Sequence, residues 1–394
     1  MKNRFVRFML LLSLAAPAAA WAQHTHHQPS KKAGLAIGAN FAPDGKLLLV
    51  GLDADARLTL RTSADDGKSW TPARLLNTGA DRVAADGEAR PKLAFGPNGV
   101  VVIAYTHPLA KPYTGEIRML RSDDGGKTFA PPFTVHHDRQ VITHRFESIA
   151  FDDCGRLHAV WVDKRDQELR SRQGAAKPAY RGAAIYHNVS DDGGKTFGDD
   201  RKLADYSCEC CRIALARTPE GGIAALWRHV FAPNIRDHAF AVLNDAATAA
   251  DPVRATFDNW AIDACPHHGP GLTPAAGGGY HAVWFGDKAG AAQVRYGRLD
   301  QNGAPASEPV ALPDEQAEHA DVLSIGAKVA IVWRSFDGSA TSLKAWISDD
   351  DGRHFRLRQL ARSNALVDNP LLLRKEGKIF AVWHTQGKTY VEAL

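Results

Sequence analysis

Long apolar segments are almost absent from the sequence. The single one, residues 8–20, follows three basic residues and ends at Ala20-Trp21-Ala22, a small-x-small sequence. It is shorter than the roughly 20 residues that a membrane-spanning helix needs. The pattern therefore predicts a secretory signal peptide, residues 1–22, cut after Ala22. We expect a periplasmic or secreted protein whose mature chain has no transmembrane segment.

Cysteine and net charge are both low, which argues against two classes of protein. Five cysteines allow at most two internal disulfides and leave at least one thiol. A chain of 394 residues can bury a sizeable core, so the fold does not depend on disulfides. The formal net charge of +4 falls close to neutral when the basic signal peptide is removed. Nothing indicates a nucleic-acid partner.

Helical periodicity is also close to absent, and a repeat of short strands takes its place. Each unit has an apolar strand, a tight turn and a second strand that ends in an aromatic residue. The units are residues 93–105, 149–161, 213–227, 272–284, 322–333 and 371–383, with a weaker copy at 41–51. Their spacing of roughly 50 to 66 residues is typical of propeller blades.

The repeat predicts an all-β protein, a β-propeller of four-stranded blades. We expect one propeller domain, residues 34–394, after a His-rich leader at residues 23–33. Seven blades are expected, with a strand from the mature N-terminus completing the short last blade. Six is the alternative, in which the N-terminal unit itself closes the last blade.

Four hairpin sequences share a second pattern, Ser-x-Asp-x-Gly-x-Thr-aromatic, with small departures. They are residues 63–70, 122–129, 190–197 and 348–355. In this pattern, the Asp box, the chain resembles the sialidase-like, or BNR-repeat, superfamily of β-propellers. The resemblance covers nearly all of the mature chain. The motif serves structure: Asp accepts hydrogen bonds from its own turn, Gly supplies a positive φ, and the aromatic residue packs between blades.

Blade topology predicts which face carries function. The start of the first strand and the end of the second lie on one face, at the mouth of the central channel. The four hairpins and Cys154 are expected on the opposite face. Ionisable and soft-ligand groups gather at the predicted mouth, as in a binding or catalytic site. They include Glu88, Arg90, His144, Arg145, Glu147, Cys208, Cys210, Cys211, Arg212, His267, His268, His319, Asp321 and Asp368.

The densest group of these residues precedes two neighbouring strands. Residues 206–212 read Tyr-Ser-Cys-Glu-Cys-Cys-Arg, and residues 263–269 read Asp-Ala-Cys-Pro-His-His-Gly. Thiolate and imidazole together favour copper or zinc over magnesium or calcium. We expect a soft transition metal, copper ahead of zinc, bound for metal handling or redox chemistry. The predicted ligands are Cys208, Cys210, Cys211, Cys265, His267 and His268, with His144 and His319 as further candidates.

Other interpretations of these segments stay open. A disulfide can join one of the three clustered cysteines to Cys265 in an oxidising compartment, or one such bridge can coexist with a metal on the remaining groups. Glu147 and Arg212 are expected to orient ligands or to receive a small anion. The His-rich leader either collects metal or is a disordered polar segment.

The resemblance also implies a second function, an exo-α-sialidase or related glycoside hydrolase. Sialidases clamp the substrate carboxylate with three arginines and use a Tyr-Glu nucleophile pair. Arginines at the predicted mouth are Arg90, Arg145, Arg212, Arg228 and Arg334, with Glu147 and Asp163 as acid and base.

Two departures count against a sialidase. The Arg-Ile-Pro segment of true sialidases is replaced by Ala89-Arg90-Pro91, and no tyrosine is clearly placed at the mouth. A third interpretation is a non-catalytic platform for a periplasmic or outer-membrane protein.

Overall fold

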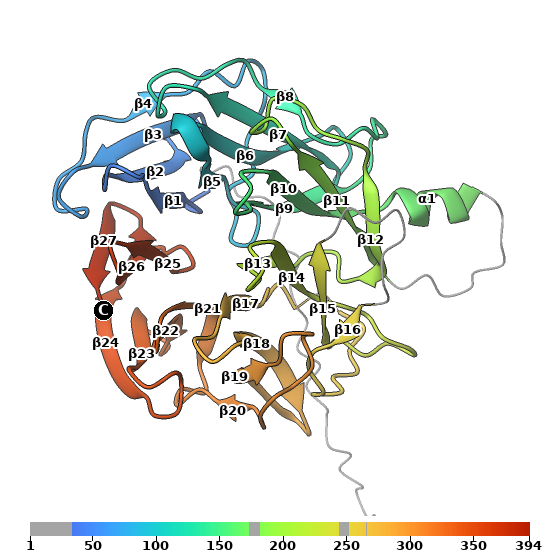
Figure 1. Ribbon diagram of the computed structural model, residues 1–394, viewed down its shortest axis with the longest axis vertical. Coiled ribbons are helices and arrows are strands. Elements are labelled where there is room, and N and C mark those ends of the chain that lie inside the picture. Colours follow the sequence, from blue (N-terminus) through green and yellow to red (C-terminus); the bar gives the residue numbers. More distant parts are fainter. Residues whose placement is uncertain (1–33, 173–181, 244–251, 265) are drawn as a thin grey trace, which may run out of the picture. The chain divides into compact units, whose positions relative to one another are not determined.

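Seven antiparallel sheets follow one another along the chain and stand in a ring (Figure 1). The computed structural model describes residues 34–172, 182–243, 252–264 and 266–394. Each sheet is one blade, so the predicted all-β propeller and its seven blades are confirmed. The predicted signal peptide, the His-rich leader and Cys265 lie outside the described residues.

The first three blades contain twelve strands and the α-helix α1 (Arg165–Arg172). Blade 1 consists of β1 (Gly38–Phe41), β2 (Leu47–Leu52), β3 (Leu58–Ser63) and β4 (Arg74–Leu75). Blade 2 has β5 (Lys92–Phe95), a 3-10 turn (Pro97–Gly99), β6 (Val101–Pro108), β7 (Gly115–Ser122) and β8 (Phe133–Thr134). Blade 3 has β9 (His144–Phe151), β10 (Leu157–Asp163), β11 (Ala183–Ser190) and β12 (Arg201–Ser207).

The remaining four blades continue this order. Blade 4 has β13 (Ala214–Arg217), β14 (Ile223–Arg228), β15 (His238–Leu243) and β16 (Val253–Arg254). Blade 5 has β17 (Gly271–Pro274), β18 (Tyr280–Lys288), β19 (Ala291–Leu299) and β20 (Val310–Ala311). Blade 6 has β21 (Ala317–Ile325), β22 (Lys328–Phe336), β23 (Thr341–Ser348) and β24 (Arg356–Ser363). Blade 7 has β25 (Leu371–Lys375), β26 (Lys378–Thr385) and β27 (Lys388–Ala393).

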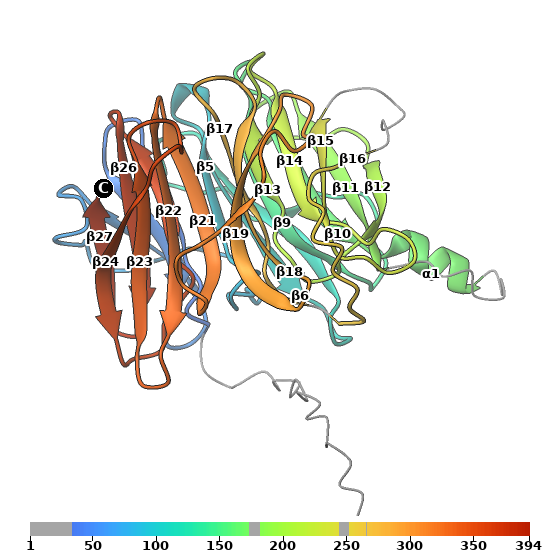
Figure 2. The same cartoon turned by 90° about the horizontal axis from the view of Figure 1, so that it is seen from below.

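The core is divided among seven clusters of buried side chains, each between two neighbouring blades. The aromatic residue that ends the repeated second strand contributes to six of them, since its large area is best buried against the next sheet. These residues are Tyr105, Trp161, Trp227, Trp284, Trp333 and Trp383. The seventh cluster instead contains Phe41 and Phe380, whose ring centroids are 5.0 Å apart. In side view α1 projects outward from the ring (Figure 2).

The four repeated hairpins use their shared residues for local hydrogen bonding. Ser122 Oγ accepts a bond from Gly126 N (2.9 Å) and donates one to Asp124 (2.7 Å). Asp124 in turn accepts bonds from the backbone N and the hydroxyl of Thr128. Ser63, Ser190 and Ser348 begin equivalent networks. Because Gly125 N donates to Gly99 O in the β5–β6 turn, the hairpins lie on the face opposite the strand starts.

The last blade has three strands in the described part of the chain, β25, β26 and β27. The mature N-terminus, from which a completing strand is predicted, lies outside the described residues up to residue 33. The chain before β1 runs near the ring centre, where Ala36 N donates to Ala85 O (3.2 Å) and Ile37 N to Asp368 Oδ2 (3.0 Å). Arg90 forms a buried ion pair with Asp368 (2.9 Å). Among the described residues, side-chain packing and the hydrogen bond from Ile37 N to Asp368 join the first and last blades, and the ion pair of Arg90 ties blade 2 to blade 7.

Candidate functional site

Three sulfur atoms meet in the loop between β12 and β13. Cys208 Sγ lies 3.8 Å from the Sγ atoms of both Cys210 and Cys211, and all three sulfurs lie within 4.8 Å of one another. The three side chains are 1%, 6% and 3% exposed. Cys210 is disulfide-bonded, whereas Cys208 and Cys211 carry thiols. The loop therefore combines a disulfide with two neighbouring thiols, and the partner of Cys210 lies outside the described residues.

The backbone of blade 4 holds this loop in place. Cys208 N donates to Arg228 O (2.9 Å), and Val230 N donates to Tyr206 O (2.7 Å), so the loop is pinned against the end of β14. Tyr206 has a φ of 62°, a left-handed conformation that is unusual for a bulky residue and turns the chain into the loop. The cysteines belong to the apolar cluster that contains Trp227. The site is thus fixed and shielded from water.

A buried arginine lies beside the sulfurs. Arg228 is 1% exposed and donates to three backbone carbonyls, those of Arg236, His268 and Phe285. No carboxylate in the described parts of the chain pairs with it. The hydrogen bond from Cys211, followed by the charge of Arg228, lowers the pKa of the Cys208 thiol. Negative charge is therefore favoured on Cys208, whereas the hydrogen bond to Cys208, together with burial, raises the pKa of the Cys211 thiol.

A second group of polar residues lies at the channel mouth, where Glu88, just before blade 2, bonds to residues of blades 4, 5 and 6. Its carboxylate accepts bonds from Arg212 Nη1 (3.1 Å), from the backbone N of Arg212 (3.1 Å) and Gly269 (3.2 Å), and from His319 Nδ1 (2.8 Å). Burial opposes its ionisation, but Arg212 and His319 outweigh burial and hold the pKa of Glu88 well below its usual range. Glu88 is therefore an ionised, fully bonded anchor.

Two imidazoles lie next to this anchor. The rings of His268 and His319 stack with centroids 4.3 Å apart, and His268 also stacks on Phe285. Burial lowers the pKa of both histidines, and His268 Nδ1 is buried without a hydrogen-bond partner. His267 is exposed with a φ of 57°, and His319 has a φ of 50°. Imidazoles with lowered pKa values thus lie beside Glu88. Among the described residues, none of them belongs to the group of three sulfurs that could hold a metal ion.

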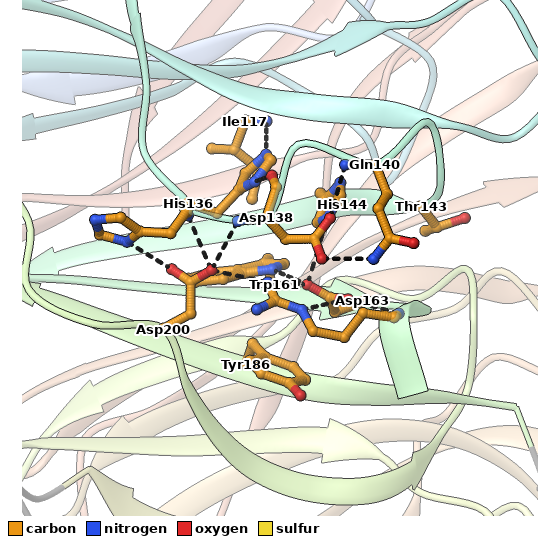
Figure 3. A network of polar contacts seen from close by, with 12 residues as sticks. Ile117, His136, Asp138, Gln140, Thr143, His144, Trp161, Asp163, Tyr186 and Asp200 are labelled. Atoms are coloured by element: carbon orange, nitrogen blue, oxygen red, sulfur yellow. Dashed lines mark hydrogen bonds and ion pairs between the residues drawn. The ribbon is translucent and has the colours of Figure 1, made fainter. Parts of the chain in front are cut away.

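His144 and Asp163 occupy a separate polar network between blades 2 and 3 (Figure 3). The ring of His144 stacks on His136 at 3.9 Å, and its Nε2 lies 3.3 Å from Asp138 and 3.7 Å from Asp163. Asp163 also pairs with Arg165 and accepts a bond from Trp161 Nε1. No cysteine takes part in the network drawn in Figure 3.

Sequence reasoning missed His136 and Asp138, which belong to this network. Both lie in the irregular segment between β8 and β9, and the repeat does not extend over that segment.

The arginines predicted for a carboxylate clamp are largely engaged within the protein. Arg90 pairs with Asp368, Arg212 with Glu88, and Arg334 with Glu318 (3.2 Å). Arg228 is bonded to carbonyls as described. Arg145 lies 4.8 Å over the Phe146 ring and has no carboxylate partner in the part of the chain that the structure describes.

Glu147 and Lys92 are two further buried charges near the channel. Glu147 accepts a bond from Thr106 (2.7 Å), and burial raises its pKa. Burial also lowers the pKa of Lys92 to about 8. Sequence reasoning missed Lys92, although a lysine that opens an otherwise apolar strand, β5, is a readable signal.

The comparisons with known proteins show the fold. Neither a protein-family model nor the sequence of a curated protein matches the chain. Among solved structures, a polysaccharide lyase, a PL25 ulvan lyase bound to -[GlcA(1-4)Rha3S]-, is similar with a TM-score of 0.56 and 11% identity over 92% of this chain and 94% of that one. The α-L-arabinanase of Penicillium chrysogenum has a TM-score of 0.51 and 14% identity, covering 77% and 91%. A leech intramolecular trans-sialidase has a TM-score of 0.50 and 10% identity, covering 90% and 84%.

These neighbours are propeller glycoside hydrolases, lyases and sialidases, and at such identities they establish the architecture alone. Among the described residues, no helix is long and apolar enough to span a membrane.

Proposed function

We propose that the protein, in its reduced form, binds a soft transition metal ion through Cys208, Cys210 and Cys211. The observation that carries the proposal is the convergence of three buried sulfurs within 4.8 Å of one another. Three thiolates form a soft donor set that suits Cu(I) first and Zn(II) second. Because Cys210 is disulfide-bonded, two-electron reduction must precede binding by all three.

The charge balance of the site supports this proposal. Three thiolates and a monovalent ion carry a net charge of −2, which is unfavourable in an apolar cluster unless a positive charge lies nearby. Arg228 supplies that charge and lacks a carboxylate partner among the described residues. His267 and His268, in the loop before β17, and His319, at the start of β21, remain proposed ligands for an entering ion, as do Cys265 and His144 for a larger set.

Elemental analysis tests the metal proposal. The protein is reduced with a phosphine under anaerobic conditions, incubated with Cu(I), and desalted. We expect about one copper per chain for the wild type and for Cys154→Ser, which removes an exposed thiol in the β9–β10 turn. The Cys210→Ser, Cys211→Ser double variant should lose most of it. Equal copper in the double variant and the wild type would overturn the proposal.

A second candidate function is action on an anionic carbohydrate at the channel mouth. It is favoured by Arg145, which has no carboxylate partner among the described residues, and by Lys92 with its lowered pKa. The similar folds include a lyase bound to a glucuronate-containing sugar and a trans-sialidase. We propose that Arg145 binds the carboxylate of such a substrate. Activity on a fluorogenic sialoside or a uronate polysaccharide that Arg145→Ala abolishes supports this function, whereas no turnover of either substrate contradicts it.

A further inference from the structure

Cys208 lies equally close to two sulfurs of different kinds. One, 3.8 Å away, is the disulfide sulfur of Cys210, and the other, also 3.8 Å away, is the thiol sulfur of Cys211. The sequence Cys208-Glu209-Cys210-Cys211 has the C-x-x-C spacing that supports reversible disulfides within one loop. The Cys208 thiol is therefore in contact with both a disulfide sulfur and a second thiol.

We propose that the disulfide moves within this loop by internal thiol–disulfide exchange and that Cys208 and Cys211 form its second resting position. The protein thus has two oxidised forms with the same number of electrons. One has the disulfide at Cys210, and the other has it between Cys208 and Cys211.

The exchange balances without an external oxidant or reductant. In the first step the Cys208 thiol loses its proton and its Sγ bonds to Cys210 Sγ, while the bond from Cys210 to its present partner breaks. The partner sulfur leaves as a thiolate and takes up the proton. In the second step the deprotonated Cys211 Sγ bonds to Cys208 Sγ, and Cys210 leaves as a thiolate and is protonated in turn. One disulfide breaks and one forms.

Burial makes an internal route the favoured one. The side chains of Cys208 and Cys211 are almost fully buried, so an external disulfide has little access to them, whereas Cys210 is in contact with Cys208. The buried guanidinium of Arg228 favours negative charge on Cys208 and Cys211, the two attacking sulfurs. The inference rests on sulfur positions alone and does not depend on metal binding.

Disulfide mapping in a metal chelator tests the exchange. Native Cys154→Ser protein, which removes intermolecular scrambling through the exposed thiol, is held at pH 8, quenched with acid, unfolded and alkylated. Trypsin releases residues 203–212, which contain all three cysteines. We expect two products in mass spectrometry. In one, Cys210 is cross-linked to another peptide and two cysteines are alkylated; in the other, Cys208 and Cys211 are bridged and Cys210 is alkylated.

The Cys208→Ser variant supplies the matched control, because the relay cannot start without its thiol. It should show the Cys210 cross-link alone. Detection of only the Cys210 cross-link in the Cys154→Ser protein, after hours at pH 8, overturns the proposal even if Cys208→Ser fails to fold. Because chelator is present, this result is independent of copper content, so exchange and metal binding can fail separately.

Discussion

Glu88 shows how one buried carboxylate organises the channel mouth. It receives hydrogen bonds from Arg212, Gly269 and His319, which lie in the loops before β13 and β17 and at the start of β21. Removing its charge leaves the partly buried guanidinium of Arg212 without its counter-ion. Such a loss is costly because desolvation of the remaining charge is no longer offset.

At this scale we predict that Glu88→Gln lowers the free energy of unfolding by about 3 kcal/mol at pH 7. The folded-state pKa of Glu88 lies below that of an unfolded glutamate, about 4.3. Its stabilising charge is therefore present above that pH and lost as the pH falls through the folded-state pKa. The difference between wild type and variant should shrink between pH 5 and pH 3 in urea titrations.

Glu318→Gln is the matched control for that prediction. The Glu318–Arg334 pair is more exposed, at 44% and 26%, so its loss should change stability by at most about 1 kcal/mol. A Glu88→Gln effect that is the same at pH 7 and pH 3 would contradict the electrostatic role assigned to Glu88.

Among the structural elements, the four hairpins between third and fourth strands repeat one hydrogen-bonding scheme. Ser122 is buried and accepts the bond from the buried Gly126 N. Ser122→Ala leaves this donor unsatisfied, so we expect the free energy of unfolding to fall by about 1–2 kcal/mol. Denaturant midpoints measure the change.

Ser339→Ala, in the β22–β23 turn, provides the comparison because Ser339 is exposed and its turn also relies on Asp337. Its effect should stay within about 0.5 kcal/mol. Equal losses for the two serine variants would show that the shared hairpin bonds do not stabilise the blades.

The strands themselves could be predicted from the sequence because each repeat ends its second strand with an aromatic residue that must be buried between blades. Trp161, Trp227 and Trp333 are almost fully buried, as this requires. The side-chain direction of His144 could not be predicted. A register shift between β9 and β10, next to Phe146 with its φ of 56°, sets that direction, and a local pattern does not encode such a bulge.

The cysteine loop was predicted only in part. The clustering of Cys208, Cys210 and Cys211 follows from their spacing. Which of them forms a disulfide is a long-range property that cysteine spacing alone cannot determine.

The whole molecule is closed into a ring by contacts between the first and last blades. The sequence predicts a shared sheet at this seam, and the mature N-terminus that would supply its strand lies outside the described residues up to residue 33. The chain before β1 bonds to Ala85 and Asp368 near the ring centre. The buried pair of Arg90 and Asp368 ties blade 2 to blade 7.

For the ring we predict that Asp368→Ala lowers the free energy of unfolding by about 3 kcal/mol, because Arg90 is left buried and unpaired. Asp44→Ala, which removes an exposed pair with Lys46, should change it by less than about 1 kcal/mol. Thermal unfolding of both variants measures these two losses of stability. Similar melting temperatures for the two would mean that the seam is held by apolar packing alone.

The ring also explains why the sulfurs lie where they do. Neighbouring blades bring the ends of β12 and β14 together, and the apolar cluster between blades 3 and 4 encloses the cysteine loop. The channel mouth and the buried sulfur site are thus adjacent, because Arg212, which bonds to Glu88, directly follows Cys211 in the chain.

X-ray absorption at the copper edge, on reduced protein loaded with Cu(I), identifies the atoms that bind the metal. Binding by Cys208, Cys210 and Cys211 predicts a copper ion coordinated by about three sulfur atoms, with that signal lost in the Cys210→Ser, Cys211→Ser variant and kept in Cys154→Ser. A coordination sphere dominated by nitrogen or oxygen, or a sulfur signal that survives in the double variant, would contradict it.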